Sequence, residues 1–226
     1  MEFSRHLAAA VDMSGNMARF ALAEADGGRI ICRTRKPMRQ REAAALADFI
    51  FESLSCAQHD IREINAWTIG SGPGSFTGMR LAAALVAGLS RKNGVLVRCV
   101  PTAVAIAGTP GPFPENRNVA ALFDGRNKEI IAFEMRSNGN ELIPTGKSCV
   151  LNAMQAKEYF KNHEDFTFVA QAYELDPILR LVPEENEIKV VEHFDPALLI
   201  TAQYQPYDGN FNNLEYIRPA VFPPKK

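Results

Sequence analysis

The densest group of residues that could do chemistry is a glycine-rich run, Gly70-Ser71-Gly72-Pro73-Gly74-Ser75-Phe76-Thr77-Gly78-Met79-Arg80. It stands between an apolar stretch of strand length and a long stretch of small residues with helical periodicity. A helix that begins after such a turn directs unpaired amides and the positive end of its dipole at the turn, which favours an anion or a carboxylate. Ser75 is the predicted N-cap of this helix. The run therefore predicts a tight turn, with an anion site or a partner surface as the functional alternatives.

Two common phosphate-binding signatures do not fit this run. A Walker A loop has Lys followed by Ser or Thr after its last glycine, whereas Gly78 is followed by Met79-Arg80. A dinucleotide-binding GxGxxG motif that begins at Gly72 meets Thr77 at its third glycine position, and no acid stands about 20 residues further on. Ser75 lacks the GxSxG spacing of a nucleophile elbow, so helix capping is the preferred interpretation.

Two acids stand at the ends of predicted strands. Asp12 is closely followed by Ser14, and Asp124 is closely followed by Arg126. Each acid can close a turn through its own side chain, which is the preferred interpretation, and a position in a cleft between two lobes is the functional alternative. The four histidines occur singly and the four cysteines lie far apart, so the spacing predicts neither a metal site nor a disulfide framework.

Composition limits the class of protein. The 226 residues are 46% hydrophobic and 23% charged with a net charge of −1, which is typical of a globular protein without overall attraction to nucleic acid or anionic membranes. The densest basic stretch, residues 33–41, is interpreted as a solvated loop in preference to a phosphate-binding arm. The sequence shows no signal-type N-terminus and no apolar segment of about 20 residues, so we expect a cytoplasmic protein with no membrane partner.

Hydrophobic periodicity predicts two α/β halves. In the first half we expect strands at 7–12, 17–25, 29–34, 64–69 and 95–100, with helices at 41–55, 76–91 and from 101. In the second half we expect strands at 119–123, 129–135, 142–150 and 166–170, with a helix at 152–160. The helix at 76–91 is small and apolar all round, so we expect other elements to bury it closely.

The order β-β-β-α-β-α thus appears twice. A cluster of proline and glycine at residues 109–114 separates the two copies, so we place the boundary between an N-terminal lobe, 1–110, and a C-terminal lobe, 111–226. The pattern predicts an α/β fold of two lobes, each with a mixed sheet, in preference to a doubly wound sheet of strictly alternating strands and helices.

Taken together, the glycine run and three other segments resemble the TsaB family, also called YeaZ, the bacterial partner protein in the synthesis of threonylcarbamoyladenosine on tRNA. Gly72 to Arg80 resembles the most specific motif of that family. The other segments agree in order: Val11-Asp12-Met13-Ser14 resembles its opening Asp-Thr-Ser, Phe123-Asp124-Gly125-Arg126 its Asp-Ala-Arg segment, and Tyr216-Ile217-Arg218-Pro219 its Tyr-Leu-Arg ending. The chain departs from the family where Met13 replaces Thr, where Gln40-Arg41-Glu42 replaces His-Ser-Glu, and at Ile130-Ile131 in a segment that often carries Tyr.

The resemblance implies an actin/Hsp70-like (ASKHA) fold and a non-catalytic subunit that supports threonylcarbamoyl transfer to adenosine 37 of tRNA. It implies a heterodimer with a TsaD-like protein, a TsaE-like ATPase as a further partner, a homodimer when the chain is alone, and only indirect contact with tRNA. The isolated chain is expected to hold no metal or cofactor, with ATP or ADP considered only at the partner interface.

The resemblance also suggests which residues matter. The motif and partner-supporting residues are Asp12, Ser14, Gly72, Gly74, Ser75, Thr77, Gly78, Arg80, Asp124 and Arg126. The helices that form the contact correspond to 41–55 and 75–91, and are represented by Leu46, Ile50, Leu54, Met79, Ala83 and Val86.

Two other functions stay open. A nucleotide-binding or phosphotransferase member of the same superfold would place Asp12, the glycine run and Asp124 around a ligand between the lobes. No second phosphate-type glycine hairpin is seen, which argues against it. The other alternative is a self-associating homodimer without a role in tRNA modification.

Overall fold

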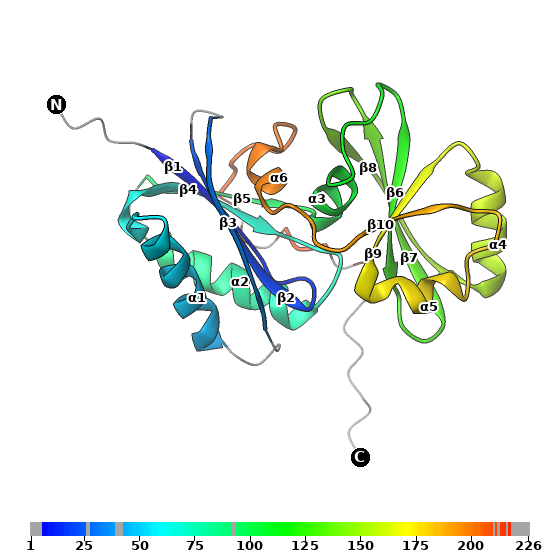
Figure 1. Cartoon of the computed structure of the whole chain (residues 1–226), viewed down its shortest axis with the longest axis horizontal. Coiled ribbons are helices and arrows are strands. Elements are labelled where there is room, and N and C mark those ends of the chain that lie inside the picture. Colours follow the sequence, from blue (N-terminus) through cyan, green and yellow to red (C-terminus); the bar gives the residue numbers. More distant parts are fainter. Residues whose placement is uncertain are drawn as a thin grey trace, which may run out of the picture.

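The computed structural model describes residues 6–25, 28–38, 43–91, 94–209, 211, 213–215 and 217. They form two mixed sheets of five strands each, with helices on both faces of each sheet (Figure 1). In this part of the chain no helix is long and apolar enough to cross a membrane. The segment Gln40-Arg41-Glu42 and the residues Tyr216, Arg218 and Pro219 lie outside the described residues.

The first sheet has the strand order β3-β2-β1-β4-β5. Its strands are β1 (Leu7–Asp12), β2 (Met17–Glu24), β3 (Ile30–Pro37), β4 (Ile64–Gly70) and β5 (Leu96–Val100). β2 is antiparallel to both of its neighbours, β1 and β3, whereas β4 and β5 run parallel to β1. The helices α1 (Ala43–Cys56) and α2 (Phe76–Leu89) pack on one face, and a short 3-10 helix, Ile61–Glu63, precedes β4.

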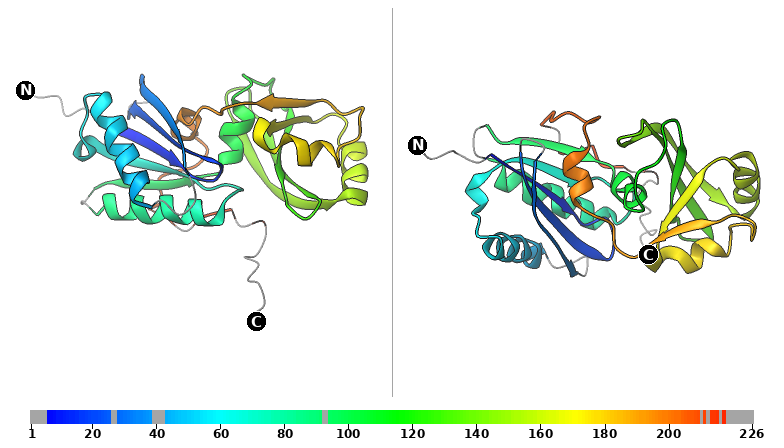
Figure 2. Two further views of the ribbon diagram at one scale, coloured as in Figure 1. Left: turned by 60° about the horizontal axis from the view of Figure 1, so that its bottom comes forward. Right: turned by 45° about the horizontal axis from the view of Figure 1, so that its top comes forward.

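The second sheet repeats this plan with the strand order β10-β9-β6-β7-β8. Its strands are β6 (Asn118–Asp124), β7 (Glu129–Ser137), β8 (Leu142–Asn152), β9 (Thr167–Gln171) and β10 (Ile188–Val191). The helices α4 (Ala153–Asn162) and α5 (Leu175–Leu179) cover its outer face, and a 3-10 helix, Ala172–Glu174, joins β9 to α5. The remaining helices, α3 (Thr102–Gly108) and α6 (Ala197–Thr201), lie between the two sheets (Figure 2).

Alternation along the strands explains these layers. In β1, Leu7, Ala9 and Val11 belong to the core beneath α1 and α2, whereas Ala10 belongs to the core between the sheets. Ala10 and Ala21, which face inward from β1 and β2, are small, which lets α6 approach the first sheet while α3 lies against the second. One hydrophobic cluster therefore joins the two lobes.

The predicted elements and the duplicated order are confirmed, with differences of a few residues at their ends. The prediction that α2 is buried on all sides is wrong. Its buried residues are Gly78, Met79, Ala82, Ala83 and Val86, and its opposite face is open to solvent. Small side chains are compatible with close packing but do not show how many sides are packed. The division at residue 110 stays a prediction.

After β10 the chain returns to the first lobe, and Arg98 of β5 holds it there. Arg98 is 4% exposed. Its guanidinium donates to the carbonyls of Leu199 and Ile200 at the end of α6, to those of Ala202 and Gln205 just after it, and to the Thr68 hydroxyl. Carbonyls at a helix C-terminus have no partner within the helix and carry partial negative charge, so they suit a buried cation that has no carboxylate.

We expect Arg98→Met to lower the free energy of unfolding by about 3 kcal/mol, because methionine keeps the apolar stem but leaves four carbonyls without donors. Urea unfolding measures this loss, and limited proteolysis should cut the chain sooner after residue 200. Arg136→Met, on an exposed position of β7, is the matched control and should change stability by less than about 0.5 kcal/mol. Equal effects of the two changes would refute the role given to Arg98.

Candidate functional site at the glycine turn and the cleft

The glycine turn packs directly against the turn between β1 and β2. The Ser75 amide donates to the Ser14 carbonyl at 2.6 Å. A Cβ atom at Gly74 would overlap the same carbonyl, and one at Gly78 would overlap the Met13 carbonyl. Glycine is therefore needed at these two positions because backbone lies where a side chain would begin. Ser75 is the N-cap of α2, as predicted, and accepts a hydrogen bond from the Gly78 amide at 3.2 Å.

Asp12 fixes this arrangement from the end of β1. Its carboxylate is fully buried and accepts hydrogen bonds from the Ser14 amide at 3.2 Å, the Ser14 hydroxyl at 3.1 Å and the Thr102 hydroxyl at 2.5 Å. Thr102 in turn accepts from the Gly72 amide at 3.1 Å. Burial raises the pKa of Asp12, although the Arg19 charge and these hydrogen bonds act against that rise. The turn interpretation of Asp12 is confirmed.

A cleft of about 470 Å³ opens between the lobes beside this contact. The structure brings six of the predicted site residues to its wall, namely Ser14, Gly74, Ser75, Asp124 and Arg126 of the motif and Met79 of the interface helices. Asp12, Gly72, Thr77, Gly78 and Arg80 do not line it. Asp12, Gly72 and Gly78 lie behind the wall, while Thr77 and Arg80 are exposed on α2. The glycine run thus shapes the cleft more than it lines it.

The second lobe contributes charged groups to the cleft. Asp124 accepts a hydrogen bond from the Arg126 amide at 2.8 Å, which closes the turn after β6, and it also lines the cleft. Glu174, which the sequence did not identify, lies beside it in the 3-10 helix after β9. Burial raises the pKa of Glu174 to about 7. The nearby Asp124 charge adds to this rise, while hydrogen bonds from Tyr173 and the Asp124 backbone and the Arg126 charge oppose it.

The C-terminal segment closes one side of the cleft. Glu215 and Ile217 line the cleft, and the Glu215 amide donates to the Ser71 carbonyl at 2.8 Å. Burial raises the pKa of Glu215. With Asp124 and Glu174, this places three carboxyl groups in the cleft against one guanidinium, so the wall favours a cationic or neutral group over a phosphate. No group of three or more His, Cys, Asp or Glu suited to a metal is found in the part of the chain described.

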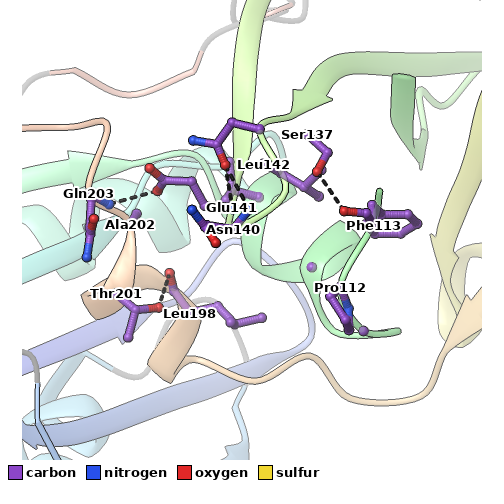
Figure 3. Close-up of a pocket in the computed structure, with 14 residues that line it drawn as sticks. Pro112, Phe113, Ser137, Asn140, Glu141, Leu142, Leu198, Thr201, Ala202 and Gln203 are labelled. Carbon is purple, nitrogen blue, oxygen red and sulfur yellow. Dashed lines mark hydrogen bonds between the residues drawn. The ribbon is translucent and has the colours of Figure 1, made fainter. Parts of the chain in front are cut away.

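A larger cavity of about 670 Å³ lies elsewhere, between α3, the turn from β7 to β8, and α6 (Figure 3). Several of its polar groups bond to one another. Glu141 accepts from the Gln203 amide at 2.8 Å, and Ser137 donates to the Phe113 carbonyl at 3.0 Å. None of the predicted site residues lines it.

The residues predicted to represent the interface helices face inward. Each is at most 8% exposed. Met79 lines the cleft, and the other five belong to the core of the first lobe: Leu46, Ile50, Leu54, Ala83 and Val86. A partner that docks on these helices would therefore meet other side chains. On α2 the exposed residues are Thr77, Arg80, Ala84 and Gly88. Helical periodicity identified an apolar face of each helix but could not tell a core face from a partner face.

Several solved structures share the architecture of this chain. YeaZ from Pseudomonas aeruginosa is 21% identical with a TM-score of 0.68, over 88% of this chain and 91% of that chain. An uncharacterized protein with similarity to peptidase YEAZ from Pseudomonas aeruginosa is 21% identical with a TM-score of 0.69, over the same shares. Ethanolamine utilization protein EutJ from Carboxydothermus hydrogenoformans is 12% identical with a TM-score of 0.53, over 86% of this chain and 89% of that chain. No match to a curated protein sequence is found.

The two duplicated sheets and the cleft between them define a two-lobed α/β protein with the actin-like (ASKHA) fold. The family model described as "TsaD: tRNA N6-adenosine threonylcarbamoyltransferase" matches residues 38–172, which is more than half of the chain. The chain belongs to this TsaD family. The relationship predicted from the glycine run is confirmed at this level, and the fold is that of YeaZ.

We expect Gly78→Ala to destabilise the protein by about 2 kcal/mol or more, although alanine favours a helix, because its Cβ meets the Met13 carbonyl. Gly88→Ala is the matched control on the same helix. Nothing lies within 4 Å of a Cβ at Gly88, so this change should stabilise by about 0.5–1 kcal/mol. Urea unfolding of both variants at one protein concentration measures the difference, and two changes of the same sign would contradict the proposed contact.

We expect Glu174→Gln to remove a pH dependence of stability. The folded chain holds a proton on Glu174 up to a pKa of about 7, whereas the unfolded chain releases it near 4.5. The contribution of protonated Glu174 to the free energy of unfolding is therefore fully present below about pH 4.5 and is lost as the pH rises through 7. This loss is on the order of 3 kcal/mol. Urea unfolding from pH 4.5 to 8 measures it. Glu185→Gln is the control, because Glu185 is exposed, and its stability should depend on pH as that of the wild-type chain does. If Glu174→Gln also kept the wild-type pH dependence, the role given to Glu174 would be wrong.

Proposed function

We propose that this chain is a TsaB-type subunit that binds a TsaD-like protein and supports threonylcarbamoyl transfer to adenosine 37 of tRNA. It has no active site of its own in this proposal, and the chemistry takes place in the partner. Membership of the TsaD family and the YeaZ-like fold support a role in this modification. The observation that carries the proposal is the outer face of α2.

This face is open to solvent and is built for close contact. Ala84 and Gly88 are exposed one turn apart, and Leu81 and Leu85 beside them are only half-buried. Side chains this small let another helix approach the backbone of α2, and the two leucines supply apolar area that a partner would remove from water. On the neighbouring α1, Phe51 is 47% exposed. The two helices together offer an apolar surface to a second subunit.

The glycine turn would determine how this surface is presented. The Ser75 cap and the close contact at Gly78 fix the first turn of α2 against the end of β1. A helix held at its first turn keeps one angle to the sheet, so its outer face is already arranged before a partner binds. The family motif then acts on the partner through α2, not through a bound phosphate.

Other partners follow from the same proposal. A second copy of the chain and a TsaD-like protein would use the same face of α2 and would compete for it. A TsaE-like ATPase, with ATP or ADP at the partner interface, remains a prediction from the resemblance, and a cytoplasmic location remains a prediction from the sequence. The alternative of nucleotide binding in the cleft is disfavoured by the carboxyl groups of Asp124, Glu174 and Glu215, and calorimetry with magnesium ATP would test it.

Ala84→Arg tests the proposal, because a long cation on the outer face of α2 blocks helix contact while leaving the core of the lobe intact. We expect it to lower the affinity for the TsaD-like protein of the same organism at least about a hundredfold, so that the two proteins no longer copurify. It should also fail to restore threonylcarbamoyladenosine in tRNA when the chromosomal gene is deleted. Mass spectrometry of tRNA nucleosides measures this.

Met154→Arg is the control, since Met154 is 78% exposed on α4 of the other lobe. This variant should bind and restore the modification like the wild-type chain. A deletion strain that keeps a normal level of threonylcarbamoyladenosine would overturn the proposed function, and normal binding by Ala84→Arg would overturn the proposed surface.

A further inference from the structure

The pairing of β2 with β3 sets two arginines opposite each other. Arg19 of β2 is the direct partner of Arg35 of β3, and Arg33 lies two residues further along the same face. Like charges at directly opposed positions of an antiparallel pair destabilise it. Asp12, the partner of Arg19 on β1, directs its carboxylate oxygens to Ser14 and Thr102. The sheet therefore carries a concentration of positive charge that its own neighbours do not fully offset.

Arg19 is also short of acceptors. It is 1% exposed, and only one of its terminal nitrogens is hydrogen-bonded, to Gln171 at 3.3 Å. The Nε and the other terminal nitrogen of Arg19 are buried without a hydrogen-bond partner. The Phe194 ring lies 4.1 Å from the guanidinium carbon and covers one face of it. A buried guanidinium with unmet donors is costly unless an acceptor is supplied.

A cavity of about 240 Å³ lies at this point, lined by residues of β3 and of the segment that joins β10 to α6. Its charged and titratable lining groups are Arg19, Arg33, Arg35, His193 and Asp195. Both carboxylate oxygens of Asp195 lie 2.8 Å from the Nε of Arg33, and one of them also accepts from the Ala197 amide at 2.9 Å. Asp195 is thus engaged with Arg33 and with the start of α6. In the part of the chain that the structure describes, the Arg35 side chain makes no hydrogen bond or ion pair.

We propose that this cavity binds a single phosphate group, held between the guanidinium groups of Arg19 and Arg35 with His193 at its edge. Guanidinium groups present their donors in a planar fork that suits phosphate oxygens, and a doubly charged anion between Arg19 and Arg35 removes their repulsion. The group belongs to inorganic phosphate or to a small phosphate monoester. This proposal does not depend on the partner role of α2.

A polynucleotide fits the surroundings less well. The other basic side chains on β3 or next to it are already paired, Arg29 with Glu24 at 3.3 Å and Lys36 with Glu52 at 3.3 Å. The net charge of the chain is −1. Binding to an RNA backbone requires several uncompensated cations along a track, whereas the structure concentrates them at one point.

Calorimetric titration of the full chain with inorganic phosphate and with ribose 5-phosphate tests the proposal and separates the two sources. We expect saturable binding of one phosphate group per chain. Arg35→Gln, on an exposed position, should weaken that binding at least about tenfold, since each charged hydrogen bond contributes about 1.5–3 kcal/mol. Lys36→Gln is the matched control, because Lys36 points to the opposite face of the same strand and pairs with Glu52 of α1. It should change the affinity less than about twofold.

Arg19→Gln is a second variant, with circular dichroism to check its fold, and it should weaken phosphate binding as Arg35→Gln does. Absence of saturable binding to the wild-type chain at millimolar phosphate would overturn the proposal. So would equal losses in Arg35→Gln and Lys36→Gln. An unstructured RNA oligonucleotide that binds more tightly than both phosphates, and loses affinity in Lys36→Gln as well, would replace the single site with an RNA-binding surface.

Discussion

The Asp12 carboxylate lies at the end of β1 without contact with solvent, so its charge and lone pairs must be met by groups that other segments bring to it. Ser14 supplies an amide and a hydroxyl from the next turn, and Thr102 supplies a hydroxyl from the start of α3. Because Thr102 also accepts from the Gly72 amide, the same contact fixes the glycine turn. Three segments that are far apart in the sequence, around Asp12, Gly72 and Thr102, are thereby tied to one point at the end of the first sheet.

The orientation of α2 depends on this point, since the Ser75 amide and the close contact at Gly78 both engage the turn that follows Asp12. The cleft depends on it as well, because Ser14 and Gly74 form its first-lobe wall. A second buried charge, Arg98, works in a comparable way at the far side of the sheet, where it holds the end of α6 through backbone carbonyls. In both places a buried charge is satisfied by uncharged groups, which ties it to particular backbone positions and not to one mobile counter-ion.

The sequence was sufficient for the features that depend on local chemistry. Strand alternation, helical periodicity and the Ser75 cap are properties of short segments, and the structure confirms them. It was not sufficient for features that depend on distant contacts. Glu174 follows β9 in a segment without a motif, and its pKa reflects burial against a cleft that forms only when both lobes are folded. Likewise, the pattern of α2 shows that Met79 and Val86 share an apolar face, but only the packed lobe shows that this face is internal and that Ala84 and Gly88 lie outside.

The distribution of charge shows why a net charge of −1 is a poor guide to this surface. The cleft gathers the carboxyl groups of Asp124, Glu174 and Glu215 around Arg126, while the cavity beside β3 gathers three arginines around Asp195. The difference begins in the strand register, where Asp12, Arg19 and Arg35 follow one another across three strands. Asp12 is satisfied by hydroxyl and amide donors and leaves two donors of Arg19 unmet, so the charge of Arg19 adds to that of Arg33 and Arg35 in the same cavity. The register that buries Asp12 beneath the glycine turn thus also concentrates positive charge at the cavity beside β3.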